Sequence, residues 1–161
     1  MKKQAVAGTD GDKYIPYENR EGQESVVYFT ANLSAEGLLR IFDKVGAHLT
    51  GKVGIKLHTG EKDGPNIIPR PWVKKLVDKR LSSAAIVETN TYYEGDRYTT
   101  PQHRETIAVN GWTFCPVDIL DEDGIVMLPV NGGKWFTEMA MGGHLPGYDS
   151  LLVLTHFKGH T

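Results

Sequence analysis

The alternation of short apolar runs with helical patterns most constrains how this chain can fold. The apolar runs are rich in aliphatic and β-branched residues and cover 25–30, 52–58, 84–88, 115–120 and 150–155. Segments with helical periodicity or helix signals separate them, at 35–49, 71–81, 101–110 and 134–141. Strands that alternate with helices form parallel sheets. The pattern therefore predicts a three-layer α/β fold of Rossmann-like type, with a mostly parallel sheet and helices on both faces.

Local signals define the ends of the expected helices. Ser34 and Thr100 are suitable N-caps, and Pro71 suits the first turn of a helix. Asn110 and the following glycine indicate a helix end. An Asp-Gly pair at 123–124 predicts a tight turn into a further strand at 125–130, which would form a hairpin with 115–120.

The 161 residues suffice for one domain, which we place at 23–161 after a mobile arm at 1–22. The last apolar run, 150–155, is continuously apolar, as expected of a strand buried on both faces. Only a few residues follow it in this sequence, too few for a covering helix. We expect either a fragment of a longer protein or a fold that a partner completes, and the open strand edge favours a homodimer.

Composition narrows the functional classes. The net charge is −2 and basic residues are scattered, which argues against nucleic acid or an anionic membrane as a partner. The sequence shows neither a membrane-length apolar stretch nor a signal peptide, so we expect a cytoplasmic protein. Cys115 is the single cysteine, and it cannot hold an iron–sulfur cluster within this chain. We interpret it as a core residue.

The ends of the expected strands gather polar side chains. Ligands of open α/β sheets bind beyond the carboxyl ends of the strands. Lys56 and His58 end the second run, Glu88 ends the third, and Asp118 lies in the fourth. The last run leads into His156, Lys158 and His160. The sequence therefore predicts one ligand site along this edge of the sheet.

Two kinds of ligand suit these residues. A small anionic molecule would contact residues chosen from Lys56, His58, Glu61, Asn90, Thr91, Arg97, His103 and Lys158. A transition metal would use His58, His156 and His160, with Glu61 as a further candidate. Each of these residues also has an ordinary structural explanation. The histidines would be strand-end residues satisfied by backbone groups, Lys56 would pair with Glu88, Arg97 would be an exposed loop residue, and His48 and His144 would lie on the surface.

The same loops resemble a known family, domain of unknown function 362. The matching blocks are 55–61, Asn66 with 70–71, the long block 88–97, 99–100 with His103, 123–124, and the closing 155–160. The resemblance spans roughly residues 25–161. Members are often labelled uncharacterised iron–sulfur centre proteins, and many carry a ferredoxin-like cysteine module that this chain lacks. They usually continue into a Gly-rich stretch that is missing here.

The resemblance implies a domain that binds a small anionic ligand or a metal-bearing cofactor, as an enzyme of anaerobic or redox metabolism. The alternative is a non-catalytic accessory domain that works with an iron–sulfur partner protein. In the pattern of its loops the chain is also distantly similar to the nickel-pincer lactate racemase family. That likeness, too, implies a small anionic substrate or a metal-bearing cofactor.

Overall fold

The computed structural model describes residues 26–64 and 66–156. Its main sheet is parallel, with the order β3-β2-β1-β6. The strands are β1 (Val53–Lys56), β2 (Ala85–Glu88), β3 (Val117–Ile119) and β6 (Ser150–Val153). Its α-helices are α1 (Ala35–Val45), α2 (Arg70–Arg80) and α3 (Thr100–Val109). This mostly parallel sheet with helices confirms the α/β architecture predicted from the sequence, and it is consistent with a three-layer fold.

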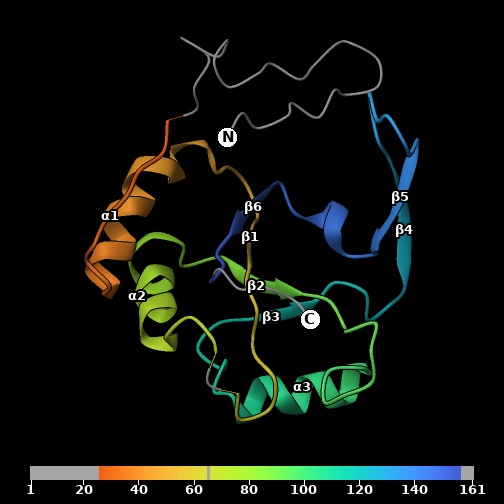
Figure 1. Ribbon diagram of the computed structural model, residues 1–161, viewed down its shortest axis with the longest axis horizontal. Coiled ribbons are helices and arrows are strands. Elements are labelled where there is room, and N and C mark those ends of the chain that lie inside the picture. Colours follow the sequence, from red (N-terminus) through yellow and green to blue (C-terminus); the bar gives the residue numbers. More distant parts are fainter. Residues whose placement is uncertain (1–25, 65, 157–161) are drawn as a thin grey trace, which may run out of the picture.

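Figure 1 shows α1 and α2 side by side at the left, α3 at the bottom, and the sheet between these helices and a β ribbon at the right. The ribbon consists of β4 (Ile125–Pro129) and β5 (Glu138–Gly142), paired antiparallel. Two 3-10 turns complete the elements, η2 (Gly46–His48) and η3 (Leu145–Gly147).

One apolar core lies between the sheet and the helices α2 and α3. Alternate residues of β1 and its extension face it, namely Val53, Ile55 and Leu57. Ile86 of β2 pairs with Ile55 in register, and Ile119 of β3 faces the same core. The helices contribute Val73, Val77 and Ile107, with Trp112 just after α3. Successive side chains of a strand point to opposite faces of the sheet. The strand residues between these core residues therefore face the other side of the sheet.

The predicted helix signals are largely confirmed. Ser34 caps α1 by accepting the Gly37 N–H. α2 has a proline in its first turn, and α3 ends at Asn110 with Gly111 at a positive φ of 76°. The N-cap of α3 is Thr99 rather than Thr100.

Three element predictions are wrong. Residues 26–30 form neither helix nor strand, and Val26, Val27 and Phe29 are largely exposed. The strand that pairs with β1 at the edge of the sheet is β6. Whether a segment forms a strand depends on a pairing partner as well as on its local composition. The expected helix at 134–141 is replaced by β5, which pairs with β4. β4 therefore forms its hairpin with β5 and not with β3.

Candidate functional site

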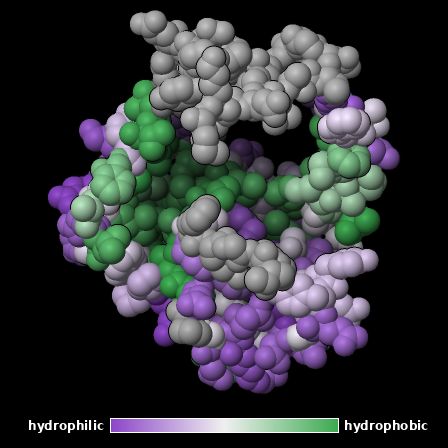
Figure 2. Space-filling view, in the orientation of Figure 1, coloured by the Kyte–Doolittle hydropathy of each residue, from purple (hydrophilic) through white to green (hydrophobic). Residues whose placement is uncertain are grey.

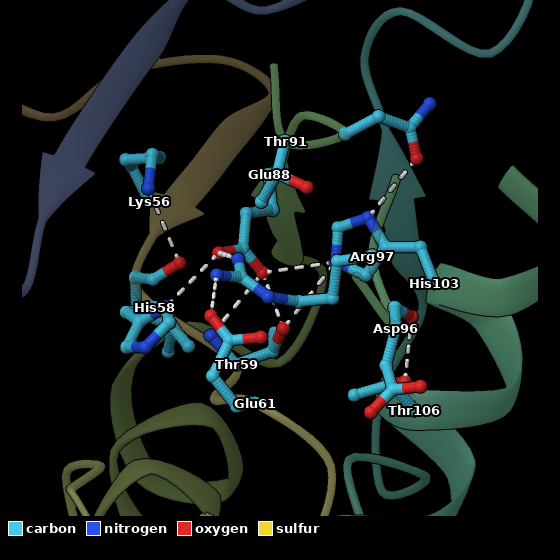
Figure 3. A network of polar contacts seen from close by, with 12 residues as sticks. Lys56, His58, Thr59, Glu61, Glu88, Thr91, Asp96, Arg97, His103 and Thr106 are labelled. Atoms are coloured by element: carbon cyan, nitrogen blue, oxygen red, sulfur yellow. Dashed lines mark hydrogen bonds and ion pairs between the residues drawn. The ribbon is translucent and has the colours of Figure 1, made fainter. Parts of the chain in front are cut away.

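The carboxylate of Glu88 is the centre of a buried polar network at the carboxyl ends of β1 and β2 (Figure 3). Glu88 ends the otherwise apolar strand β2, and its side chain contacts α3 through His103 and the loop after β1 through Thr59. Its Oε2 accepts the Thr59 backbone N–H at 3.2 Å and the Thr59 hydroxyl, and it lies 3.3 Å from His103 Nε2. Its Oε1 accepts from Arg97 Nη1 at 3.2 Å.

These contacts keep Glu88 ionised. Burial alone would raise the pKa of this carboxyl group. Hydrogen bonds from His103, His58 and Thr59, with the nearby charge of Lys56, outweigh burial and hold the pKa of Glu88 far below its usual range. Glu88 is therefore a fixed negative charge that organises the cationic and hydrogen-bonding groups around it.

His103 and Arg97 enclose Glu88 from the α3 side. The side chain of His103 is wholly buried, and its Nδ1 lies 3.2 Å from Asn90 Oδ1. Arg97 donates from Nη2 to Glu61 and to the Tyr93 hydroxyl. Burial would lower the pKa of Arg97, but Glu61 and Glu88 raise it, and the Arg97 hydrogen bond in turn lowers the pKa of Glu61. Arg97 thus ties the loop after β1 to the loop after β2.

His58, Lys56 and His156 form the more open part of the site. His58 Nδ1 lies 3.5 Å from Glu88 Oε1, and about a quarter of the side chain is exposed. The His58 and His156 rings have centroids 6.1 Å apart with a tilt of 35°. His156 Nε2 is buried and has no hydrogen-bond partner in the described part of the chain. Lys56 Nζ donates to the Leu57 carbonyl, and Figure 3 shows it on the same side of the network as His58.

The structure brings most of the sequence-predicted residues into this one region. His58 and His156 lie beside one another, and Glu61, Arg97, His103 and Asn90 belong to the Glu88 network. Thr91 supports the loop, since its N–H donates to the Arg97 carbonyl and its hydroxyl to the Tyr93 carbonyl. Lys158 and His160 lie outside the described residues, as does the amino-terminal arm.

Sequence reasoning missed the residues that hold the network together. Thr59 is fully buried, and its carbonyl accepts from Asn110 Nδ2 at 3.1 Å and from Trp112 Nε1 at 2.7 Å. Asn110 also donates to the Glu61 carbonyl. The signal for Glu88 was present, because a carboxylate that ends an apolar strand must find partners when it is buried. For Asn110 the sequence indicated only the end of a helix and gave no sign of its hydrogen bonds to the Thr59 and Glu61 carbonyls.

A second polar cluster lies away from this network. Asp118 of β3 accepts from His144, with 2.7 Å between Oδ1 and Nδ1, and from the Tyr148 hydroxyl at 2.7 Å. His144 Nε2 lies 3.0 Å from Asp123 Oδ2. His144 remains partly exposed, with 28% of its side chain accessible, but nothing in the sequence indicated its contacts with Asp118 and Asp123. His48 is exposed, as predicted.

Among the described residues, no helix is both long enough and apolar enough to cross a membrane. No curated protein and no solved structure matches the chain. The family model described as "Domain of unknown function (DUF362)" matches residues 53–161, which includes β1, the Glu88 network and the second polar cluster. The chain therefore belongs to the DUF362 family.

Proposed function

We propose that the protein binds a small, negatively charged, metal-bearing ligand at the carboxyl ends of β1 and β6. In this proposal His58 and His156 bind the metal, and Lys56 meets the negative charge. The pairing of His58 and His156 beside the buried Glu88 is the observation that carries the proposal.

The Glu88–His58 contact supports a role for His58 as a ligand. A histidine that donates from Nδ1 to a carboxylate keeps one ring orientation and presents Nε2 to a metal or a proton. Glu88 stays ionised and is itself held by Thr59, Arg97 and His103, so in this proposal it sets the orientation of the His58 ring. In the described residues His58 Nε2 makes no hydrogen bond and is free to bind a ligand.

His156, three residues beyond the end of β6, supports the same conclusion. Its Nε2 is buried and lacks a hydrogen-bond partner in the described part of the chain, although buried polar atoms are nearly always paired. A ligand atom would satisfy it. The ring separation of 6.1 Å allows both imidazoles to reach one ion after a small adjustment of their side chains. Two imidazoles leave coordination positions for a cofactor, for water, or for His160, which stays a sequence-based prediction.

Lys56 favours an anionic group on the ligand. It ends β1 between Val87 and Val153 of the flanking strands, and its described hydrogen bond goes to a backbone carbonyl. An ammonium group so placed attracts negative charge. Arg97 and Glu61 are engaged with one another, so in this proposal they, Asn90, Thr91 and His103 position the loops rather than contact the ligand.

Metal binding by the chelator-treated full chain tests the proposal. We expect Ni²⁺, Co²⁺ or Zn²⁺ to bind, and we expect His58→Ala and His156→Ala each to weaken one binding site at least tenfold. His48→Ala is the matched control, because His48 is an exposed residue of η2 and its substitution should leave binding unchanged. Equal binding by His58→Ala, His156→Ala and wild type would contradict the metal role of the pair.

A non-catalytic accessory role with an iron–sulfur partner protein is the second candidate. Exposed apolar side chains on β6, Leu151 and Val153, favour it, together with Met127, Met139 and Met141 of the β4–β5 ribbon. Figure 2 shows apolar surface in the hollow between α1 and this ribbon. If wild type binds neither metal nor small anions while remaining folded, this role becomes the better explanation. Light scattering of Leu151→Ser and wild type would then show whether β6 mediates association.

A further inference from the structure

The second polar cluster has the composition of a metal site. Asp118 lies in β3, Glu122 in the turn before β4, and His144 two residues after the end of β5. One ligand atom from each of these three residues lies within 4.8 Å of the other two. Asp118 and Glu122 lie four residues apart on one segment, His144 comes from a distant one, and none of the three contributes to the Glu88 network. The approach of His144 to the two carboxylates depends on the tertiary structure.

The backbone around the cluster is closely fixed. The His144 N–H donates to the Leu120 carbonyl and the Gly143 N–H to the Gly124 carbonyl, both at 2.9 Å. A Cβ atom at Gly142 would lie only 2.6 Å from Leu120 Cβ and 2.7 Å from its carbonyl carbon. Glycine at 142 therefore allows the end of β5 to pack directly against the end of β3. This packing brings His144 to Asp118.

Asp118 is oriented, and the partner in ion-pair contact with it is an imidazole rather than a lysine or arginine. The Tyr148 hydroxyl donates to its Oδ2, which leaves Oδ1 directed at His144. Its side chain is only 21% exposed, and in the described part of the chain no lysine or arginine lies within 4.0 Å of it. A mostly buried carboxylate normally has a cation beside it. Here an imidazole occupies that place.

The local charge also favours a cation. Four carboxylates occur within six residues, at Asp118, Asp121, Glu122 and Asp123. Arg104 forms an ion pair with Glu122, and Asn90 donates its N–H to Asp121. Two carboxylates and an imidazole are a donor set suited to Zn²⁺ or Mn²⁺, whereas Ca²⁺ and Mg²⁺ prefer oxygen ligands alone.

We infer that Asp118, Glu122 and His144 bind a divalent transition-metal ion of the Zn²⁺ or Mn²⁺ class. The site joins β3, the turn before β4 and the end of β5, so the ion would fasten the β4–β5 ribbon to the main sheet. It is separate from the ligand site proposed at His58 and His156, and it does not depend on that proposal.

Zn²⁺ titration of the full chain carrying both His58→Ala and His156→Ala tests this inference with the first site removed. We expect one equivalent of Zn²⁺ to bind, and we expect adding Glu122→Gln or His144→Ala to weaken binding at least tenfold. Glu138→Gln is the matched control, since Glu138 is an exposed carboxylate of β5 outside the cluster. Circular dichroism checks that each variant is folded, and the partly exposed Glu122 makes its substitution the safer one.

Two results would overturn the inference. One is the absence of Zn²⁺ and Mn²⁺ binding by the His58→Ala/His156→Ala protein at metal concentrations up to about 1 mM, which corresponds to only about 4 kcal/mol. The other is binding that Glu122→Gln and His144→Ala leave unchanged. Neither result bears on the His58–His156 pair, whose own test uses variants of those two residues.

Discussion

Glu88 is the residue on which the candidate site depends most. It is 4% exposed, and five groups from the loop after β1, the loop after β2 and α3 contact its two oxygens. A buried carboxylate with this many donors is stabilised as an ion, and removing its charge leaves the donors around it unpaired. The Glu88 side chain therefore contributes both to the stability of the fold and to the geometry of the candidate site.

Glu88→Gln tests this dependence. We expect a loss of about 3 kcal/mol in the free energy of unfolding at pH 7, because breaking a buried ion pair costs about 3–5 kcal/mol. Urea denaturation followed by circular dichroism measures it. Glu94→Gln, at an exposed position of the following loop, should change stability by less than about 0.5 kcal/mol. A loss at Glu88 no larger than that of the control would show that the network contributes little.

The same substitution gives a pH dependence with a definite sign. The pKa of Glu88 in the folded protein lies far below its ordinary value of about 4.5. The ionised carboxylate therefore contributes its full stability above about pH 5 and loses it as the pH falls through 4 and lower. We expect the stability difference between wild type and Glu88→Gln to shrink between pH 6 and about pH 3 in parallel urea titrations. A difference that stays constant over this range would contradict the low pKa.

Trp112 is a second buried residue whose side chain connects separate segments around the site. Its side chain is 1% exposed, it packs against Phe114, and its indole N–H donates to the Thr59 carbonyl. It thereby connects the chain after α3 with the loop that carries His58 and Thr59.

For Trp112→Phe we expect a loss of about 2–3 kcal/mol, from the lost hydrogen bond together with the cavity left by the smaller ring. Chemical denaturation followed by far-ultraviolet circular dichroism measures it without relying on tryptophan emission. Trp135→Phe is the matched control, because Trp135 is largely exposed and should change stability by less than about 0.5 kcal/mol. Equal effects of the two substitutions would contradict the anchoring role of Trp112.

At the scale of elements, the junction of β3 with β5 is the least expected contact. β4 and β5 form a ribbon of their own, and a two-stranded ribbon is at best marginally stable by itself. Its base is held to the main sheet by Gly142 against Leu120 and by the His144 contacts. The ribbon therefore depends on close backbone approach at one glycine.

Gly142→Ala should disturb this junction. The added methyl group would meet Leu120 at 2.6–2.8 Å, and overpacking of this kind costs about 1–3 kcal/mol. Thermal denaturation should show a lower midpoint, and heteronuclear NMR should show the largest shifts at His144 and Leu120. Gly147→Ala meets nothing within 4 Å and serves as the control. If both substitutions leave the midpoint unchanged, the close packing does not hold the ribbon.

At the scale of the whole molecule, stability is unevenly distributed. β1 and β2 are interior strands of the main sheet, and their core residues Ile55, Ile86 and Val87 are inaccessible to solvent. The β4–β5 ribbon is largely exposed, and it meets the rest of the molecule mainly at its base. Local opening is easier where few apolar groups are buried.

Amide hydrogen exchange should follow this difference. We expect the amides of β1 and β2 to exchange only by global unfolding, while those of β4 and β5 exchange at least a hundredfold faster in the metal-free protein. Mass spectrometry of peptic fragments distinguishes the two. Addition of Zn²⁺ should slow exchange in the ribbon if the second site binds it. Equal protection of ribbon and main sheet would show that the ribbon is as firmly held as the core.

Local patterns in the sequence determined the helices, the core strands and the edge of the sheet at which polar residues gather. Ser34, Pro71 and Asn110 mark helix ends through short-range chemistry, and the apolar runs at β1 and β2 allow few environments other than a buried sheet. For the same reason Lys56, His58 and Glu88 could be placed at one edge of the sheet: parallel strands bring their carboxyl ends together.

Only the tertiary structure decided which apolar run joins the sheet and which carboxylates become centres of polar clusters. Residues 26–30 have strand-like composition but no pairing partner, whereas 138–142 pairs with β4 despite its helical pattern. Glu88 and Asp118 become centres of polar clusters through the groups that other segments bring to them, His103 and Arg97 in one case and His144 in the other. Pairing and burial depend on contacts between residues far apart in the chain, and local patterns do not specify such contacts.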